Sequence, residues 1–482
     1  MTPDITQIFP ELLVAAAALA LLMLGVFRKG DASQENTVLA IMALGGALLL
    51  LPFGGVRQTA FNGLFVVDSF GAFSKAMVLL ASALTLGMAY SFFHREKIGR
   101  FEYPILVLFA ALGMMMMISA NDFMSLYLGL ETQSLSLYVL AAFNRDSQRA
   151  TEAGLKYFVL GALASGLLLY GMSLVYGFSG TTSFDSLAKV FGSEHGPKAH
   201  LGVIAGLVFV MAGLAFKVSA VPFHMWTPDV YEGAPTPVTA FFAVGPKIAA
   251  FALLVRVLFG PFAELAEQWT QVIVFISIAS MAVGAFAAIG QTNIKRLMAY
   301  SAIGHAGFAL VGVAAGHEAG IQGVLIYLAI YLFMNVGTFA VILSMRSKGR
   351  MVEGINDLAG LGKSNPAMAF AMAVLMFSMA GIPPLAGFWG KFYVFMAAVK
   401  SGLFTLAIIG MLTSVVSAFY YLRIVKIMYF DEPVDAIDPP AEATMRLVMV
   451  LSTLVVLLFT FLPGPLVTGA RAAAQALFPA AG

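Results

Sequence analysis

Apolar runs of about twenty residues recur from one end of this chain to the other, separated mostly by short connections that are charged or rich in glycine and proline. A helix needs about 20 apolar residues to cross the hydrocarbon core of a bilayer. The pattern therefore predicts an all-α, polytopic membrane protein of about fourteen transmembrane helices. They are expected at residues 11–27, 37–53, 71–93, 103–120, 123–143, 154–178, 201–224, 238–259, 271–290, 294–315, 321–345, 366–399, 403–429 and 445–467.

Composition supports a membrane environment. Apolar residues make up 60% of the 482 positions and charged residues only 11%, whereas soluble proteins carry about 25% charged residues. The longest clear connection, Ser179 to His200, is too short for a soluble catalytic domain, so residues 1–482 are expected to form one domain. Met1 to Pro10 lack the basic residues with which a cleaved signal begins, so the first apolar run is expected to stay as a helix.

Several classes of site are excluded by what the chain lacks. With 0 cysteines, it has no disulfide, thiolate metal site, iron–sulfur ligation or cysteine nucleophile. A net charge of +2 gives no basic excess for nucleic acid. The HExxH and GxSxG motifs of common hydrolases are also absent. We therefore expect no cofactor and no metal in this chain.

Basic residues predict the orientation, because cytoplasmic loops of membrane proteins are enriched in lysine and arginine. When the connections are numbered from the first helix, most basic residues fall in odd ones, which we assign to the cytoplasm. Both termini then face the periplasm. The odd connections hold Arg28, Lys29, Arg95, Lys97, Arg100, Arg145, Arg149, Lys295, Arg296, Arg346, Lys348, Arg350, Lys363 and Arg446, and the even ones with the C-terminal tail hold Arg57, Lys189, Lys198, Lys400 and Arg471.

The seventh and twelfth helices are each interrupted by proline. The seventh runs into Pro222, and the twelfth contains Pro383 and Pro384 between two glycines. Proline removes a helical hydrogen bond, and in membranes such breaks persist where they are buried in protein or line a wet cavity. Interrupted helices in corresponding positions predict two inverted five-helix repeats with a transport site between them, over about 103–259 and 271–429. The alternative is a pair of ordinary proline kinks.

Charged residues inside the predicted helices are costly, at about 2.5–3.5 kcal/mol each on insertion scales. Arg256 and Lys75 lie near helix ends, where the favoured interpretation is that they snorkel to the interface. For Lys156 the sequence does not decide between snorkelling and a functional role. The remaining basic residues, Lys217, Lys247 and Lys391, lie next to the proline breaks or to Pro246, and Glu131 is the one deep acid that we can offer as their partner.

This set of side chains suits proton transfer. Burial lowers a lysine pKa and a nearby carboxylate raises it, so a lysine held between these influences can gain and lose a proton in the working pH range. Two histidines add groups that titrate near neutrality. His224 lies at the first break, and His305 is flanked by small residues that leave room for water. A buried histidine satisfied within the core is the alternative for each.

At these residues the sequence resembles the antiporter-like subunits of respiratory complex I, which are related to Mrp-type cation/proton antiporters. The resemblance covers nearly the whole chain. It is carried by three strings and by Lys247, which the family also shares. The strings are 216–226 (FKVSAVPFHMW), 231–238 (YEGAPTPV) and 381–391 (GIPPLAGFWGK).

The resemblance implies a role for each embedded charge. Glu131 pairs with Lys217, and Lys156 lies near that pair. Lys247 is the central relay, and Lys391 lies near the exit half-channel. The resemblance places no NADH, flavin, iron–sulfur or quinone site in this chain, because those sites belong to other subunits.

Two features separate this chain from two members of that family. It stops soon after the fourteenth expected helix, so the long lateral helix of the L-type subunit is missing, and Lys391 stands where the M-type subunit has glutamate. The implied partners are the M-type subunit, the small K-type subunit, the lateral helix of the L-type subunit and the lipid of a bacterial inner membrane.

Three functions remain open from the sequence. The chain is expected to translocate protons, driven by redox chemistry in other subunits. The second candidate is a stand-alone or Mrp-type antiporter that exchanges sodium or potassium for protons. The third is a scaffold whose charges have no transport role. A dedicated sodium or potassium site would need more acidic ligands than the single deep acid found. This favours proton translocation driven by other subunits.

Overall fold

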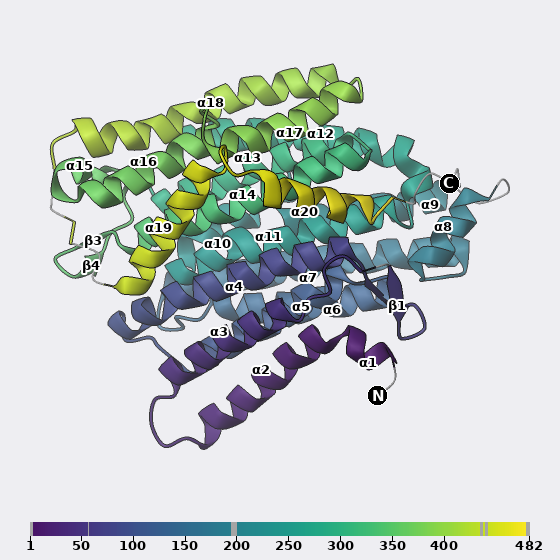
Figure 1. Cartoon of the computed structure of the whole chain (residues 1–482), viewed down its shortest axis with the longest axis horizontal. Helices are drawn as coiled ribbons and strands as arrows, with labels where there is room; N and C mark the ends of the chain where they lie inside the picture. Colours follow the sequence, from purple (N-terminus) through teal and green to yellow (C-terminus); the bar gives the residue numbers. More distant parts are fainter. Residues whose placement is uncertain (1–2, 56, 194–199, 434–436, 439–441, 479–482) are drawn as a thin grey trace.

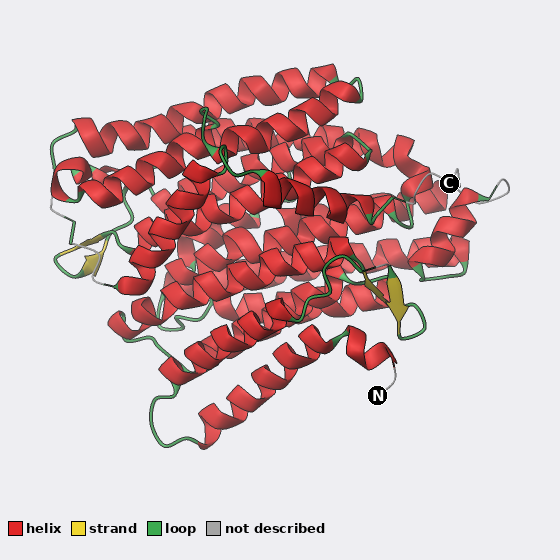
Figure 2. Cartoon of the chain, viewed as in Figure 1, coloured by secondary structure: helices red, strands yellow, loops and turns green. Residues whose placement is uncertain are grey.

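The computed structural model describes residues 3–55, 57–193, 200–433, 437–438 and 442–478. Helices make up nearly all of this part, as Figure 2 shows, which confirms the all-α prediction. The only strands within it form two short antiparallel hairpins. The first pairs β1 (Gln58–Ala60) with β2 (Phe65–Val67), and the second pairs β3 (Arg346–Ser347) with β4 (Arg350–Met351).

Each expected membrane range contains one helix or a pair of helices in the structure. The helices are α1 (Pro3–Gln7), α2 (Phe9–Phe27), α3 (Ser33–Leu49), α4 (Ser69–Arg95), α5 (Glu102–Ile118), α6 (Phe123–Ala141), α7 (Gln148–Ser179), α8 (Phe184–Gly192), α9 (Leu201–Val218), α10 (Trp226–Gly233), α11 (Thr236–Phe259), α12 (Ala266–Ile289), α13 (Ile294–Ala314), α14 (Glu318–Leu343), α15 (Leu361–Ser364), α16 (Pro366–Ala380), α17 (Ala386–Lys400), α18 (Phe404–Phe430), α19 (Ala443–Leu458) and α20 (Gly464–Gln475), with short 3-10 turns at Ala263–Leu265 and Ile355–Leu358. Within the described residues, 9 helices are long and apolar enough to cross a membrane. The total of about fourteen crossings stays a prediction.

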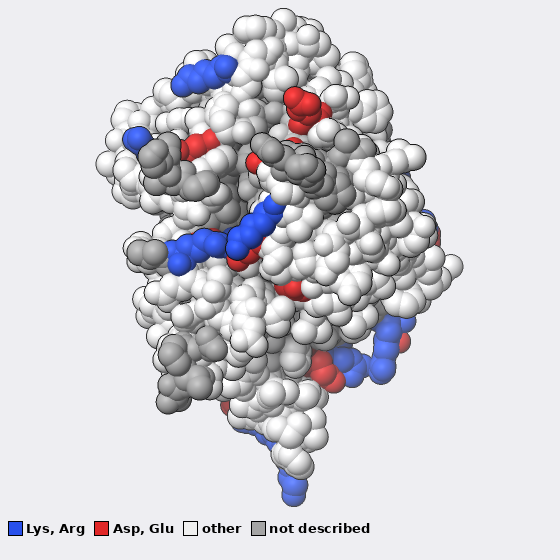
Figure 3. All heavy atoms as spheres, turned by 90° about the vertical axis from the view of Figure 1, so that its right-hand side faces the viewer, with Lys and Arg blue, Asp and Glu red and all other residues white. Residues whose placement is uncertain are grey.

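The long helices run side by side along one direction (Figure 1). In this view α1, α8, β1 and the end of α20 lie at one end of the bundle, and the β3–β4 hairpin lies at the other. Figure 3 faces the first of these ends, which shows scattered charged side chains on a mostly uncharged surface. This end contains the even connections, in which β1 and α8 lie, together with α1 and the end of α20. These parts of the sequence carry few basic residues.

The most buried helices occupy the centre of the bundle. The apolar stretch of α11 is 100% buried, and those of α13 and α14 are each 94% buried. Such helices have no lipid-facing side, so polar side chains on them are shielded by protein in every direction. Lys247 on α11 and His305 on α13 lie in this central part, where both side chains are buried.

Close backbone contacts hold neighbouring helices together in both halves. A Cβ added at Gly113 of α5 would lie 2.4 Å from the backbone nitrogen of Gln133 in α6, and one added at Gly284 of α12 would lie 2.4 Å from that of Gly304 in α13. Where glycine stands at the contact between two membrane helices, their backbones can approach closely and gain van der Waals packing. The helix pairs α5–α6 and α12–α13 are therefore each packed backbone against backbone.

The structure confirms both predicted helix breaks. The helix α9 ends at Ser219, with φ of 62°, and α16 ends at Gly381, with φ of 88°. Three residues after each of these positions stands a proline preceded by a cis peptide bond, Pro222 and Pro384. A further break, which the sequence analysis did not expect, separates α19 from α20 within the last predicted span.

Two basic residues expected to snorkel are instead buried in ion pairs. Lys75 lies 2.6 Å from Glu11 of α2, and both side chains are 6% exposed. Arg256 donates two hydrogen bonds of 2.9 Å to Asp68, the N-cap of α4, and a third to the carbonyl of Ile118. The snorkelling prediction was wrong because partners distant in sequence, which helical position alone does not reveal, satisfy both charges. Glu11 and Asp68 are also buried acids that the sequence analysis did not include.

The Asp68–Arg256 pair yields a stability prediction. Replacing Asp68 with Asn leaves a buried guanidinium without its counter-charge, which costs about 3–5 kcal/mol. We expect Asp68→Asn to lower the thermal unfolding midpoint of the purified protein in detergent. The control Glu432→Gln removes an exposed pair with Lys363, worth about 1 kcal/mol or less. Equal midpoints for the two variants would contradict a stabilising role for the buried pair.

Candidate functional site

The first part of the site lies where α6, α7 and α9 meet. Lys217, near the end of α9, is buried and donates a 2.7 Å hydrogen bond to Oγ of Ser134 in α6. One helical turn earlier, Glu131 accepts a 2.5 Å hydrogen bond from Ser165 in α7. Among the described residues no hydrogen bond or ion pair joins Glu131 to Lys217. Both lie at the same stretch of α6, where the hydroxyl of Ser134 is the direct partner of the lysine.

Lys247 lies in the middle of α11, directly after Pro246. Its Nζ lies 3.4 Å from the carbonyl oxygen of Ala302 in α13 and 5.9 Å from the centre of the Tyr231 ring. Both contacts are weak compared with an ion pair. The Lys247 side chain is therefore buried in a central position without a strong acceptor among the described residues.

His305 lies one turn beyond Ala302 on α13 and links this helix to α14 and α18. Its Nδ1 is 2.6 Å from the hydroxyl of Tyr327, and its Nε2 is 3.0 Å from that of Tyr421. Tyr421 in turn is 2.5 Å from the hydroxyl of Ser301. Both ring nitrogens thus have partners that can donate or accept a proton, which is the arrangement that a proton relay requires.

Lys391 occupies the second helix break. Its Nζ donates to the carbonyls of Met379 and Ala380 at 3.0 Å each and to Ser414 at 2.7 Å. These carbonyls end α16, where the helix leaves its last acceptors without internal donors and carries a partial negative charge. The Nζ also lies 4.8 Å from the ring centre of Phe308, one turn beyond His305. The helix α13 therefore contacts both lysines, Lys247 through Ala302 and Lys391 through Phe308.

The partners divide the buried basic residues into two groups. Lys75, Arg256 and Lys295 each form an ion pair with a carboxylate. Lys217, Lys247 and Lys391 instead bond hydroxyl and carbonyl oxygens, and in the described part of the chain no carboxylate forms an ion pair with any of them. The second group is the one that the sequence analysis singled out, together with His305. We call the group formed by Lys217, Lys247, His305 and Lys391 the lysine row.

Two expected site residues lie apart from the lysine row. The side chain of Lys156 is 42% exposed and forms ion pairs with Glu152 at 2.7 Å and Asp229 at 2.8 Å. Neither Glu131 nor Lys217 is among its partners in the described structure. It lines an open cleft of about 180 Å³ with charged residues of α7, α10 and α13. His224 lies half-buried at the first break, and its Nδ1 has no hydrogen-bond partner among the described residues.

A second cleft, of about 220 Å³, adjoins the first and is lined by Glu96, Arg149, Lys295 and Glu353. Lys295 donates to Glu353 and to the carbonyl of Ala234, both at 2.9 Å. Burial alone would raise the pKa of Glu353, but the charge and hydrogen bond of Lys295 hold it below its ordinary value of 4.5. The two clefts bring charged side chains together at the end of the bundle formed by the odd connections.

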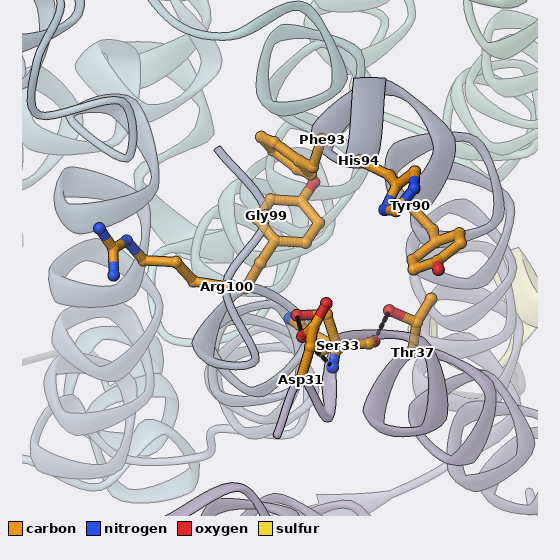
Figure 4. Close-up of a pocket in the computed structure, with 10 residues that line it drawn as sticks. Asp31, Ser33, Thr37, Tyr90, Phe93, His94, Gly99 and Arg100 are labelled. Atoms are coloured by element: carbon orange, nitrogen blue, oxygen red, sulfur yellow. Dashed lines mark hydrogen bonds between the residues drawn. The ribbon is translucent and has the colours of Figure 1, made fainter. Parts of the chain in front are cut away.

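A third pocket near the starts of α3 and α5 is smaller (Figure 4). It holds about 20 Å³, enough for one water molecule. Ser33 donates its hydroxyl at 2.5 Å and its N–H at 2.9 Å to Asp31, which lowers the pKa of that carboxyl. In Figure 4, Arg100 points away from Asp31. The residues that line this pocket do not include those of the lysine row.

Several residues of the site were not expected from the sequence. Ser134, Tyr327, Tyr421 and Ser414 each contact a proposed relay side chain. Serine and tyrosine are common in membrane helices, so nothing in the sequence distinguishes these from others. No cluster of three or more His, Cys, Asp or Glu residues that could hold a metal occurs in the described ranges.

Known proteins share this architecture and sequence. The transmembrane family of NADH:quinone oxidoreductases and Mrp antiporters matches residues 120–417. NADH-quinone oxidoreductase subunit N of Paramagnetospirillum magneticum is 71% identical, over 100% of this chain and 99% of its own length. The chain belongs to the subunit N family of NADH-quinone oxidoreductase. The subunit N of Rhodospirillum rubrum is 64% identical over 97% of this chain and 96% of its own length.

Solved structures agree with this family. A chain of respiratory complex I from Thermus thermophilus superposes with a TM-score of 0.82 at 33% identity, covering 96% of this chain and 100% of that one. A chain of the Mrp complex from a Dietzia species superposes with a TM-score of 0.86 at 23% identity, covering 99% of this chain and 98% of that one, which shows a shared fold. The subunit N family thus has the fold that Mrp antiporters also use.

The Lys295–Glu353 pair predicts how the clefts respond to pH. Because the folded pKa of Glu353 is lowered, its stabilising effect is present above about pH 4.5 and is lost as the pH falls through the folded value. Glu353→Gln should loosen the 346–354 segment at neutral pH, since a hydrogen bond to a charged group contributes about 1.5–3 kcal/mol. Limited proteolysis next to Arg350 should then speed up, and acid should have less further effect than in the unaltered protein. Equal cleavage of both proteins at pH 7 would contradict this role.

Proposed function

We propose that this chain translocates protons across the membrane as subunit N of NADH-quinone oxidoreductase, along the row formed by Lys217, Lys247, His305 and Lys391. One observation supports this proposal above the others. The three lysines of the row are buried without an ion pair in the described structure, whereas neighbouring buried cations are paired. A buried lysine with only neutral acceptors can exist as a neutral amine, so it can release and regain a proton.

Each member of the row has a distinct part in this proposal. Glu131 stabilises the charged form of Lys217 through the electric field, with Ser134 as the direct acceptor. Lys247 passes protons between the two halves, and His305 with its tyrosine partners lies between Lys247 and Lys391. His305 lies one turn from Ala302, which contacts Lys247, and one turn from Phe308, which contacts Lys391. Lys391 would release protons toward the periplasm.

Lys156 and His224 would have auxiliary parts. Lys156 shares Asp229 with Arg296 in the charged cleft, so it would help to bring protons to the end of the bundle that we assign to the cytoplasm. His224 has an unpaired buried Nδ1 at the first break, where it could accept a proton from a water molecule. Both positions are next to the row rather than within it.

We also propose that the two halves are inverted repeats, over about 103–259 and 271–429. The support is geometric. Each half contains a pair of helices in backbone contact at glycine, and each contains a helix that ends at a residue with positive φ three positions before a proline. The row would then cross from one repeat to the other at Lys247, because its acceptor Ala302 belongs to the second half.

Energy for transport would come from other subunits of the complex, which would hold FMN, the iron–sulfur clusters and the quinone. The proposed partners are the M-type subunit, the K-type subunit and the lateral helix of the L-type subunit, in a bacterial inner membrane. Two apolar faces suit such neighbours. One is on α6 and α7, and the other is on α18; their exposed members include Met124, Leu128, Leu155 and Leu163 on the first and Phe404, Leu412 and Val415 on the second.

Lys247 provides the direct test of the proposed function. Removing a group that carries the proton costs about 100-fold or more in a transfer step. We expect Lys247→Met to lower the number of protons pumped per NADH oxidised, measured in membrane vesicles, with less effect on NADH oxidation in uncoupled membranes. Lys247→Arg should fail as well, because arginine keeps the charge but does not release its proton.

The matched control is Lys400→Met, which removes an exposed lysine at the end of α17. Its pumping ratio should equal that of the unaltered complex. Only variants whose complex assembles in normal amount are compared. An assembled Lys247→Arg complex that pumps normally would show that positive charge, and not proton transfer, is what this position supplies.

Orientation is tested separately by cysteine labelling, which is clean because the native chain has 0 cysteines. Ser193 and Gln148 are both exposed and lie at opposite ends of the bundle. A membrane-impermeant maleimide added to intact cells with a permeable outer membrane should label Ser193→Cys only. Gln148→Cys should react after the inner membrane is opened. The reverse pattern would invert the orientation and place the termini in the cytoplasm.

A further inference from the structure

A large groove lies between α16 and α19, away from the lysine row. It encloses about 660 Å³, within the range of roughly 300–1,000 Å³ that ligand pockets occupy. Its walls are almost wholly apolar. They include Phe370 and Ala371 of α16 and Met449, Val450, Leu454 and Leu457 of α19. Phe370 and Val450 are 55% and 54% exposed, so the groove is open along its side.

The two helices converge at the floor of the groove. A Cβ added at Gly337 of α14 would lie 2.6 Å from Cβ of Ser452 and 3.0 Å from a methyl group of Leu375. The helices α16 and α19 are thus both seated against α14 at this level. The space between them opens outward from that contact rather than into the protein core.

One end of the groove is polar. Ser364, Asn365 and Arg446 line it, and the first turns of both α16 and α19 begin there. Arg446 is exposed, and no carboxylate of the described residues forms an ion pair with it. An exposed cation beside two helix starts attracts a negative group, and the groove next to it attracts an apolar one.

The length of the groove selects between a lipid and a protein helix as its occupant. From Arg446 to Leu457, α19 advances eleven residues, or about 16 Å at 1.5 Å per residue. This is close to half of the roughly 30 Å hydrocarbon core. A groove with one charged end and the depth of one leaflet matches an acyl chain with its headgroup, whereas a neighbouring transmembrane helix would need the full thickness.

We propose that this groove binds an anionic phospholipid, with its phosphate at Arg446 and an acyl chain along the wall formed by Met449, Val450 and Leu457. The polar end lies with the odd connections, where basic residues are concentrated. Basic pockets between transmembrane helices on that side are suited to anionic headgroups. This inference does not rest on proton translocation, because no residue of the row lines the groove.

The test uses the purified complex, stripped of lipid and then supplied with phosphatidylglycerol or phosphatidylcholine that carries a photoreactive group on one acyl chain. Cross-links are mapped by mass spectrometry of peptides. We expect phosphatidylglycerol to label α16 and α19 along the groove more than phosphatidylcholine does. Arg446→Ala should lower phosphatidylglycerol labelling about fivefold and abolish the preference, and Ala367→Trp, which fills the groove, should lower labelling by both lipids.

Matched controls are Arg471→Ala and Ala472→Trp on α20, two exposed positions outside the groove, and both should label as the unaltered complex does. Excess inorganic phosphate should not reduce labelling. Three results would overturn the proposal. These are unchanged labelling in both groove variants, displacement of the lipid by phosphate alone, or lipid labelling of a neighbouring subunit in place of α16 and α19.

Discussion

A charged side chain in the hydrocarbon core has no water to solvate it, so its partner must come from the protein itself. In this molecule that constraint is met in two ways. Lys75 and Arg256 are neutralised by carboxylates of α2 and α4, which ties the first helices to the central helix α11. Lys217, Lys247 and Lys391 are hydrogen-bonded to hydroxyl and carbonyl oxygens instead. The same physical requirement is thus met by ion pairs in the framework and by neutral acceptors in the row that we propose for proton transfer.

The helix breaks provide acceptors that an intact helix would keep for itself. The carbonyls of Met379 and Ala380 are free because α16 stops at Gly381, and they bind the amine of Lys391 from the following helix. A helix terminus in the middle of a bilayer is costly unless something binds it. Here the lysine and the terminus satisfy one another without a formal countercharge. The break and the lysine that follows it therefore stabilise each other within the bundle.

Much of the fold could be predicted from the sequence, because twenty-residue apolar runs and mid-helix prolines have direct physical meanings in a bilayer. The burial of Lys217, Lys247 and Lys391 could also be anticipated, since a charge within an apolar run is conspicuous; their part in transport stays a prediction. Their partners could not be anticipated. Position along a helix does not reveal that Arg256 reaches Asp68, 188 residues away, or that Tyr421 approaches His305 from α18. The break between α19 and α20 was also missed, although Pro463, Gly464 and Pro465 mark it, because they lie near the end of an apolar run, where a helix is expected to end in any case.

The full burial of α11 has a consequence for how the protein is made. This helix leaves the ribosome before α13 exists, so Lys247 enters the membrane before the helix that carries its acceptor Ala302. Arg256 on the same helix can already find Asp68, because α4 is synthesised earlier. One cation of α11 is thus accommodated at once, while the other carries an insertion cost of about 2.5–3.5 kcal/mol until α13 arrives. Biogenesis of this chain therefore requires the insertion machinery to retain a half-satisfied helix at the bilayer boundary while the next two are synthesised.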